Sequence, residues 1–142
     1  MFRMIRRARE RGASAVEFAL VLPIFVLLVF GIMEAGWLFA QQVEVRNAAR
    51  EGARLAVVDY ADAGTMRSEV CDRAALSRDR AQVGFTLGSD TAVVEVTQTY
   101  ASLTGVIPSF NNGITIRSVA EMRLETEIDN WNTSPLTDCP SS

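Results

Sequence analysis

Residues 11–40 read RGASAVEFALVLPIFVLLVFGIMEAGWLFA, and this stretch decides the fold of the 142-residue chain. After Arg11 its ionisable residues are Glu17 and Glu34, and none lies between Phe18 and Met33. As a helix, residues 13–40 would be about 42 Å long at ~1.5 Å per residue, which exceeds the ~30 Å hydrocarbon core of a bilayer. The stretch is therefore predicted to be a transmembrane helix.

The charges of the chain are distributed unevenly around this helix. All 14 basic residues are arginines, and five of them lie in residues 1–12 against one acid, a net charge of +4. The remainder holds nine arginines against sixteen acids, a net charge of −7. A basic leader before an apolar run sets membrane orientation, so we expect a cytoplasmic N-terminus and an exported C-terminal part. The same contrast favours a membrane protein over a nucleic-acid-binding one.

A secretory signal peptide is the competing interpretation of the N-terminus. Its apolar region usually runs ~7–15 residues and ends at a small-residue cleavage site. Here the run is longer, and residues 33–37 (MEAGW) do not form such a site, so we expect a retained anchor. Trp37 and Phe39 suit the aromatic belt at the outer membrane interface, and Glu34 is expected to be a carboxylate at that rim. Pro23 removes one helical hydrogen bond, and the sequence leaves open whether this is a passive kink or a bending point.

The helix is predicted to continue beyond the membrane to about residue 58, because no Gly-Pro punctuation interrupts it. Arginines recur every four residues at Arg46, Arg50 and Arg54, and we expect them to form a solvated face. A second face carries small and apolar side chains at helical spacing, suited to close packing against another helix or a sheet in the protein's own core, in another subunit, or in both. This second face consists of Val45, Ala49, Gly52, Ala53 and Ala56.

The remaining residues, 59–142, are predicted to form a small exported domain, which makes the fold class α+β. A short helix is expected at 66–79, with Glu69 and Arg73 paired at i, i+4. Alternation predicts strands at 93–100 and 114–124, paired antiparallel and joined by a loop over 105–113. The tail from residue 130 is expected to be turn-like.

Cys71 and Cys139 lie on the expected exported side, where disulfides form. A small domain gains most from such a bridge, which would contribute roughly 4 kcal/mol in the chain-entropy model. Two free thiols are the alternative. The chain has no histidine, so histidine-based catalytic triads and zinc sites are excluded. We expect no enzyme, no metal and no cofactor, and we expect Glu121, Glu125 and Glu127 to be an exposed strand face. The sequon at Asn132 is expected to be accidental.

The motifs GASAVEFALVLP (12–23) and NAAREGAR (47–54) resemble those of the TadE-like family, minor pilins or pseudopilins of Flp/Tad pilus systems. The resemblance covers residues 11–58. It implies a class III prepilin signal in which a prepilin peptidase cuts between Gly12 and Ala13 on the cytoplasmic side. Glu17 would then be the fifth mature residue. Many Flp-type signals have Glu-Tyr where this chain has Glu17 and Phe18.

The resemblance also implies an assembly role for Glu17. A carboxylate within a membrane helix costs on the order of 2.5–3.5 kcal/mol at the bilayer centre and less near the interface, and it usually has a partner. The new amino group of Ala13 in a neighbouring subunit could be that partner, and small residues Ala15 and Ala19 would permit close helix approach. A carboxylate among headgroups, near the arginines, is the alternative.

The sequence therefore predicts four segments: a basic leader (1–12), a transmembrane helix (13–40), its amphipathic extension (41–58) and the exported domain (59–142). By resemblance the partners are the prepilin peptidase, the major Flp-type pilin, other minor pilins and the inner-membrane assembly platform. The chain would reside in a bacterial inner membrane and could enter an extracellular pilus. The alternative function is an uncleaved single-pass membrane protein whose exported domain binds a partner or ligand.

Overall fold

A single long helix dominates the N-terminal half of the computed structural model. Helix α1 runs from Phe2 to Val58 and continues through Pro23. The structure describes residues 2–58, 63–74, 78–88, 90–105, 113–124 and 133–140. The chain divides into two compact units, an N-terminal unit (Met1–Gly36) and a C-terminal unit (Trp37–Ser142), and the boundary falls within α1. The predicted long helix is confirmed, and it begins at Phe2, within the basic leader, rather than at residue 13.

In the N-terminal unit, the side chains from Gly12 to Phe30 are all exposed. They include large apolar residues such as Leu20 (71% exposed), Ile24 (69%) and Phe18 (65%). Helix α1 is long and apolar enough to cross a membrane, and the most apolar window of its candidate span, Gly12–Val58, has none of its residues buried. Since so many exposed apolar side chains are unfavourable in water, this surface fits a membrane anchor.

The C-terminal unit contains a four-stranded antiparallel sheet with strand order β3-β2-β1-β4. The strands are β1 (Ala81–Leu87), β2 (Thr91–Thr99), β3 (Thr115–Arg123) and β4 (Ser134–Asp138). Strands β2 and β3 pair in a continuous register that sets Glu95 opposite Val119. The predicted antiparallel pair is therefore confirmed, and the α+β class with it. Gly105 (φ 66°) and Gly113 (φ 121°), the two ends of the predicted loop, have positive φ angles, which glycine adopts without steric cost.

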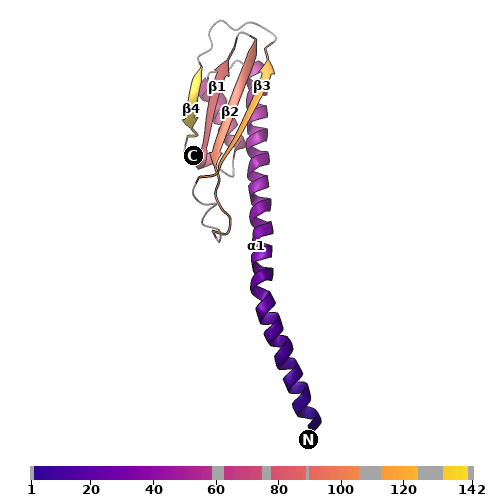
Figure 1. Ribbon diagram of the computed structural model, residues 1–142. Helices are drawn as coiled ribbons and strands as arrows, with labels where there is room; N and C mark the ends of the chain where they lie inside the picture. Colours follow the sequence, from indigo (N-terminus) through magenta and orange to yellow (C-terminus); the bar gives the residue numbers. More distant parts are fainter. Residues whose placement is uncertain are drawn as a thin grey trace. The chain divides into compact units, whose positions relative to one another are not determined.

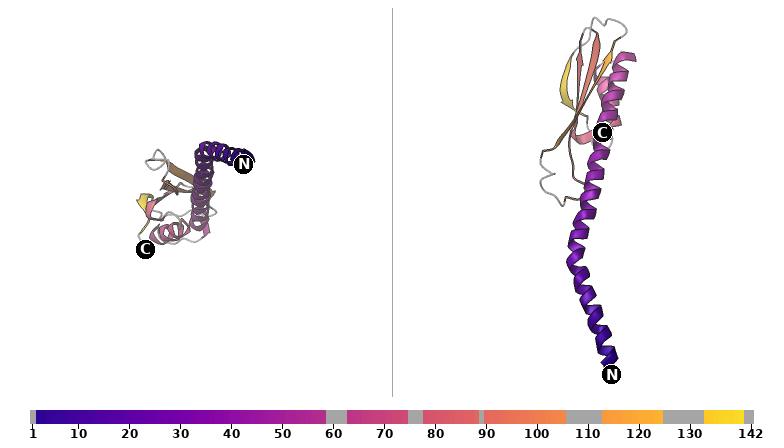
Figure 2. Two further views of the ribbon diagram at one scale, coloured as in Figure 1. Left: turned by 90° about the horizontal axis from the view of Figure 1, so that it is seen from below. Right: turned by 45° about the vertical axis from the view of Figure 1, so that its right-hand side comes forward.

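Helix α2 (Ala63–Arg73) and the C-terminal part of α1 cover the same face of the sheet (Figures 1 and 2). Alternation along the strands turns their apolar side chains towards these helices. The buried core joins Val45, Ala49 and Ala53 of α1 to Val70 of α2. From the sheet it includes Val83, Phe85, Val94, Val96 and Ile116.

A disulfide closes this unit. Cys71 at the end of α2 bonds to Cys139, which directly follows β4, with a Cα–Cα distance of 5.7 Å. The amide of Cys139 also donates to the carbonyl of Ala81 at 2.9 Å. The predicted bridge is therefore present, and it ties the edge strand β4 to the helical layer.

Several predicted elements were displaced or missed. The short helix spans Ala63–Arg73 rather than 66–79, and the amide of Ala74 donates to the carbonyls of both Val70 and Cys71 at 3.2 Å. Residues 78–80 form a 3-10 turn, η1. Strand β1, which has Gly84 at its centre, was not predicted. Strand β4, which contains Pro135, lies in the tail that was predicted to be turn-like. Glycine and proline weaken a strand pattern, although edge strands tolerate proline. Glu125, Glu127 and Asn132 lie outside the described residues.

Candidate membrane anchor and assembly surfaces

The residues predicted for processing and assembly lie in the N-terminal unit, on the exposed surface of α1. Gly12, Ala13, Glu17 and Phe18 are exposed, as are Ala15 and Ala19. A Cβ added at Gly12 would meet nothing within 4 Å. Within the described residues the Glu17 carboxylate forms no hydrogen bond and no ion pair. In a single chain, therefore, these side chains are all available to other molecules.

Glu34, which was predicted to lie at the membrane rim, is not exposed like the apolar side chains before it. Its side chain is buried, with 4% of its surface exposed, although its neighbours Met33 and Ala35 are exposed. Glu34 also takes part in an interaction. The apolar run gave no local signal for this burial.

The small and apolar residues of the helix extension are buried inside the C-terminal unit of their own chain. Val45, Ala49 and Ala53 are fully buried, and Ala56 is 1% exposed. A Cβ at Gly52 would lie 2.8 Å from Val70 Cγ2 and 3.0 Å from Val94 Cγ1. This face of α1 therefore packs against α2 and the sheet of its own chain, and it is not exposed to a second subunit.

A buried polar network lies where the helix extension begins to pack against the sheet, and the sequence pattern did not predict it. The Trp37 indole N–H and the Gln41 amide both donate to the carbonyl of Ala101, at 3.0 and 3.1 Å. The Gln98 amide donates to Gln41 Oε1 at 2.6 Å. Gln41 lies four residues before Val45 and so begins the buried stripe, which is the signal that could have indicated it. Trp37, which was predicted to lie at the membrane interface, is thus hydrogen-bonded within the C-terminal unit to a residue that follows β2.

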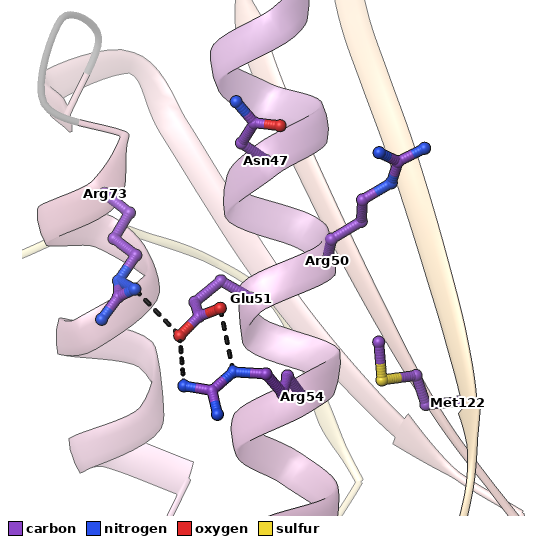
Figure 3. A pocket seen from close by; sticks show the side chains of 6 residues that line it. All are labelled: Asn47, Arg50, Glu51, Arg54, Arg73 and Met122. Carbon is purple, nitrogen blue, oxygen red and sulfur yellow. Dashed lines mark hydrogen bonds and ion pairs between the residues drawn. The ribbon is translucent and has the colours of Figure 1, made fainter.

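The three regularly spaced arginines of α1, Arg46, Arg50 and Arg54, differ in their contacts with the other described residues. Glu51 accepts from Arg54 Nη2 at 2.7 Å and Nε at 3.1 Å, and its Oε1 lies 3.0 Å from Arg73 Nη1 (Figure 3). These contacts lower the pKa of Glu51, the Arg54 hydrogen bond most, and raise that of Arg54. The predicted pair of Glu69 and Arg73 is present at 3.5 Å. Arg46 and Arg50 have no hydrogen bond or ion pair within the described part of the chain.

A shallow hollow accompanies these arginines between α1 and β3. One part, of about 420 Å³, is lined by Asn47, Arg50, Glu51, Arg54, Arg73 and Met122. A second part, of about 350 Å³, is lined by Arg46, Arg50 and residues 118–122 of β3. Figure 3 shows Arg50 extending from α1 on the side of β3 and Met122. The described residues contain no cluster of three or more acidic or cysteine side chains able to hold a metal ion.

On the outer face of the sheet, Arg117 pairs with Glu95 through two hydrogen bonds of 2.6 and 2.9 Å. This pairing raises the pKa of Arg117, chiefly through the hydrogen bond to Glu95. Glu121 on the same strand is exposed, as predicted for a solvated strand face.

Comparison with known proteins gives one positive result. No curated protein and no solved structure matches the chain. The matching family model begins at Gly12 and ends at Arg54, and so covers the anchor and most of the helix extension. Residues 12–54 match the family of TadE-like proteins, which confirms the resemblance found in the sequence.

Proposed function

We propose that this chain is a minor pilin or pseudopilin that takes part in assembly of an Flp/Tad pilus after cleavage by a prepilin peptidase. The family match over residues 12–54 carries the proposal. It coincides with a helix whose apolar side chains are exposed from residue 13 to residue 30, as a membrane anchor and a filament-packing surface both require. The match also begins at the glycine after which the peptidase would cut.

Cleavage would change the electrostatics of this surface. It would place a positive α-amino group on Ala13, four residues before the Glu17 carboxylate. Since Glu17 forms no contact within the described residues of its own chain, a neighbouring subunit's Ala13 amine can become its partner. An ion pair in an apolar environment replaces two separately unfavourable charges, so it favours one register of packed subunits.

The remaining parts of the proposal follow from this role. The chain resides in a bacterial inner membrane with its N-terminus in the cytoplasm and its C-terminal unit exported. Its partners are the peptidase, the major Flp-type pilin, other minor pilins and the assembly platform. The role is structural and not enzymatic.

Substitution of Glu17 tests the assembly role. Glu17→Gln keeps the shape of the side chain and removes its charge, and Glu17→Ala removes both. Both variants should insert into the membrane at least as well as the wild type, because burying a neutral side chain in lipid costs less. Both should reduce pilus output and co-purification with pilin subunits. Val21→Ala, one helical turn further along and also exposed, is the matched control and should retain both.

Normal pilus output and co-purification for Glu17→Gln and Glu17→Ala would contradict the assembly role. If the chain also kept its leader in cells with an active peptidase, the uncleaved anchor protein with a partner-binding domain would be the better account.

A further inference from the structure

Two unpaired arginines lie beside the hollow between α1 and β3. Arg46 and Arg50 both line it, and they form no ion pair within the described residues. The C-terminal unit as a whole has a negative net charge: residues 37–142 contain nine arginines against fourteen acids, a net charge of −5. Two cations without a partner among the described residues, on an acidic unit, are a local site for carboxylates, since charge complementarity directs binding.

The neighbouring strand has an open edge. Strand β3 is terminal in the sheet, and its nine residues contain neither proline nor glycine. Its side chains Val119 and Met122 are 50% and 36% exposed. The opposite edge, β4, has five residues, contains Pro135 and pairs with β1 through an irregular register. Shortness, proline and irregular pairing protect an edge, so β4 is protected. Strand β3 lacks these three features and has the charged residues Arg117, Glu121 and Arg123 instead, so it is the edge better suited to accept another strand.

The spacings of the two surfaces match. Arg46 and Arg50 are four residues apart on a helix, about 6 Å along its axis. Alternate residues of a strand lie about 6.6 Å apart on one face. A strand added to β3 would present every second side chain on the helix side of the sheet, which is where Arg46 and Arg50 lie.

We propose that the α1–β3 groove binds an extended acidic segment of a partner protein by strand addition to β3, with two carboxylates at i, i+2 received by Arg46 and Arg50. The backbone of the segment pairs with the β3 edge, which supplies affinity, and the arginines select for charge spacing. This surface is distinct from the Glu17 region and does not depend on leader cleavage.

A peptide-binding measurement tests this inference on the full chain in phosphatidylcholine nanodiscs. The probe is a fluorescent eight-residue peptide in which glutamate alternates with threonine and valine, and its binding is followed by anisotropy. A peptide of the same composition with its glutamates in one block should bind at least about tenfold more weakly. N-methylation of alternate probe amides on the β3 side should abolish binding, because it removes the ladder hydrogen bonds.

The variant R46Q/R50Q should also lose about tenfold in affinity, as expected when charge-assisted contacts are removed. The control is R80Q, which removes a charge from an exposed arginine that lies outside both the groove and β3. Circular dichroism and an intact disulfide should show that both variants are folded. Equal binding of the alternating and block peptides, or unchanged binding by R46Q/R50Q, would overturn the proposal. Arginine-dependent binding to phosphatidylglycerol nanodiscs without peptide binding would also overturn it, in favour of a lipid site.

Discussion

Gly52 lies at a close approach of α1 to α2 and β2. A side chain there would meet Val70 at 2.8 Å and Val94 at 3.0 Å, and both are β-branched residues within the core. Gly52→Ala gains up to about 1 kcal/mol of helix propensity but overpacks the site by about 1–3 kcal/mol. We expect a net loss of stability in thermal unfolding. The control Gly36→Ala, whose added Cβ meets nothing within 4 Å, should leave the melting temperature unchanged or raise it.

Glu51 gives the stability of the C-terminal unit a dependence on pH. Its pKa lies below its ordinary value of 4.5, mainly because of the Arg54 hydrogen bond. A depressed carboxylate pKa contributes stability that is present above the unfolded-state pKa and lost as pH falls through the folded-state pKa. From about pH 6 to about pH 3, the melting temperature should therefore fall more steeply for the wild type than for Glu51→Gln. Parallel pH profiles would contradict this assignment.

At the scale of elements, the join between α1 and the sheet depends on the network of Trp37, Gln41 and Gln98. Gln41 is fully buried and Gln98 is 1% exposed. Gln41→Leu leaves the Gln98 amide without its acceptor, so it should lower the free energy of unfolding by about 1–3 kcal/mol. The double variant Q41L/Q98L removes both partners and should be less destabilised than Q41L alone. A double variant that loses at least the sum of the single changes would show that the hydrogen bond itself is not the cause.

The elements that could be predicted are those in which local pattern and burial agree. The long helix, β2 and β3 have a clear period over many residues, and all three were found. Strands β1 and β4 were missed because Gly84 and Pro135 obscure their alternation, while pairing with neighbouring strands stabilises them. A Cβ at Gly84 would lie 3.2 Å from the backbone amide of Leu136, so this glycine permits the close approach of β4. Such a contact joins residues about fifty positions apart and leaves little local signal.

The same distinction applies to the candidate site. The residues at Gly12 and Glu17 belong to a linear motif, so sequence alone indicated them. The groove between α1 and β3 depends on tertiary packing. The regular spacing of the α1 arginines could be seen in the sequence. Only the structure shows that Glu51 pairs with Arg54 and Arg73. It also shows that Arg46 and Arg50 lie beside β3, a terminal strand of the sheet.

At the scale of the whole molecule, the disulfide holds the last strand to the helical layer. The Cys71–Cys139 bridge spans 68 positions, so in the chain-entropy model it restricts a large part of the unfolded C-terminal unit. Removing both thiols in C71A/C139A should lower the unfolding free energy by about 2–4 kcal/mol. Denaturant unfolding of the oxidised wild type and this variant, in the same detergent, measures the difference. Equal midpoints and slopes would show that packing alone holds β4 in place.

The most direct test of the proposed pilin function is the mass of the mature chain. In cells with an active prepilin peptidase, intact-mass and N-terminal analysis should find a chain that begins at Ala13. Gly12→Val should retain the leader, because it replaces the glycine after which the peptidase would cut, whereas the control Gly31→Val should be cut normally. An added Cβ meets nothing within 4 Å at either glycine, so neither substitution introduces a clash within the chain. Without the peptidase, all three chains should remain full length. A wild-type chain that keeps residues 1–12 while the same peptidase cuts the major pilin would contradict the account.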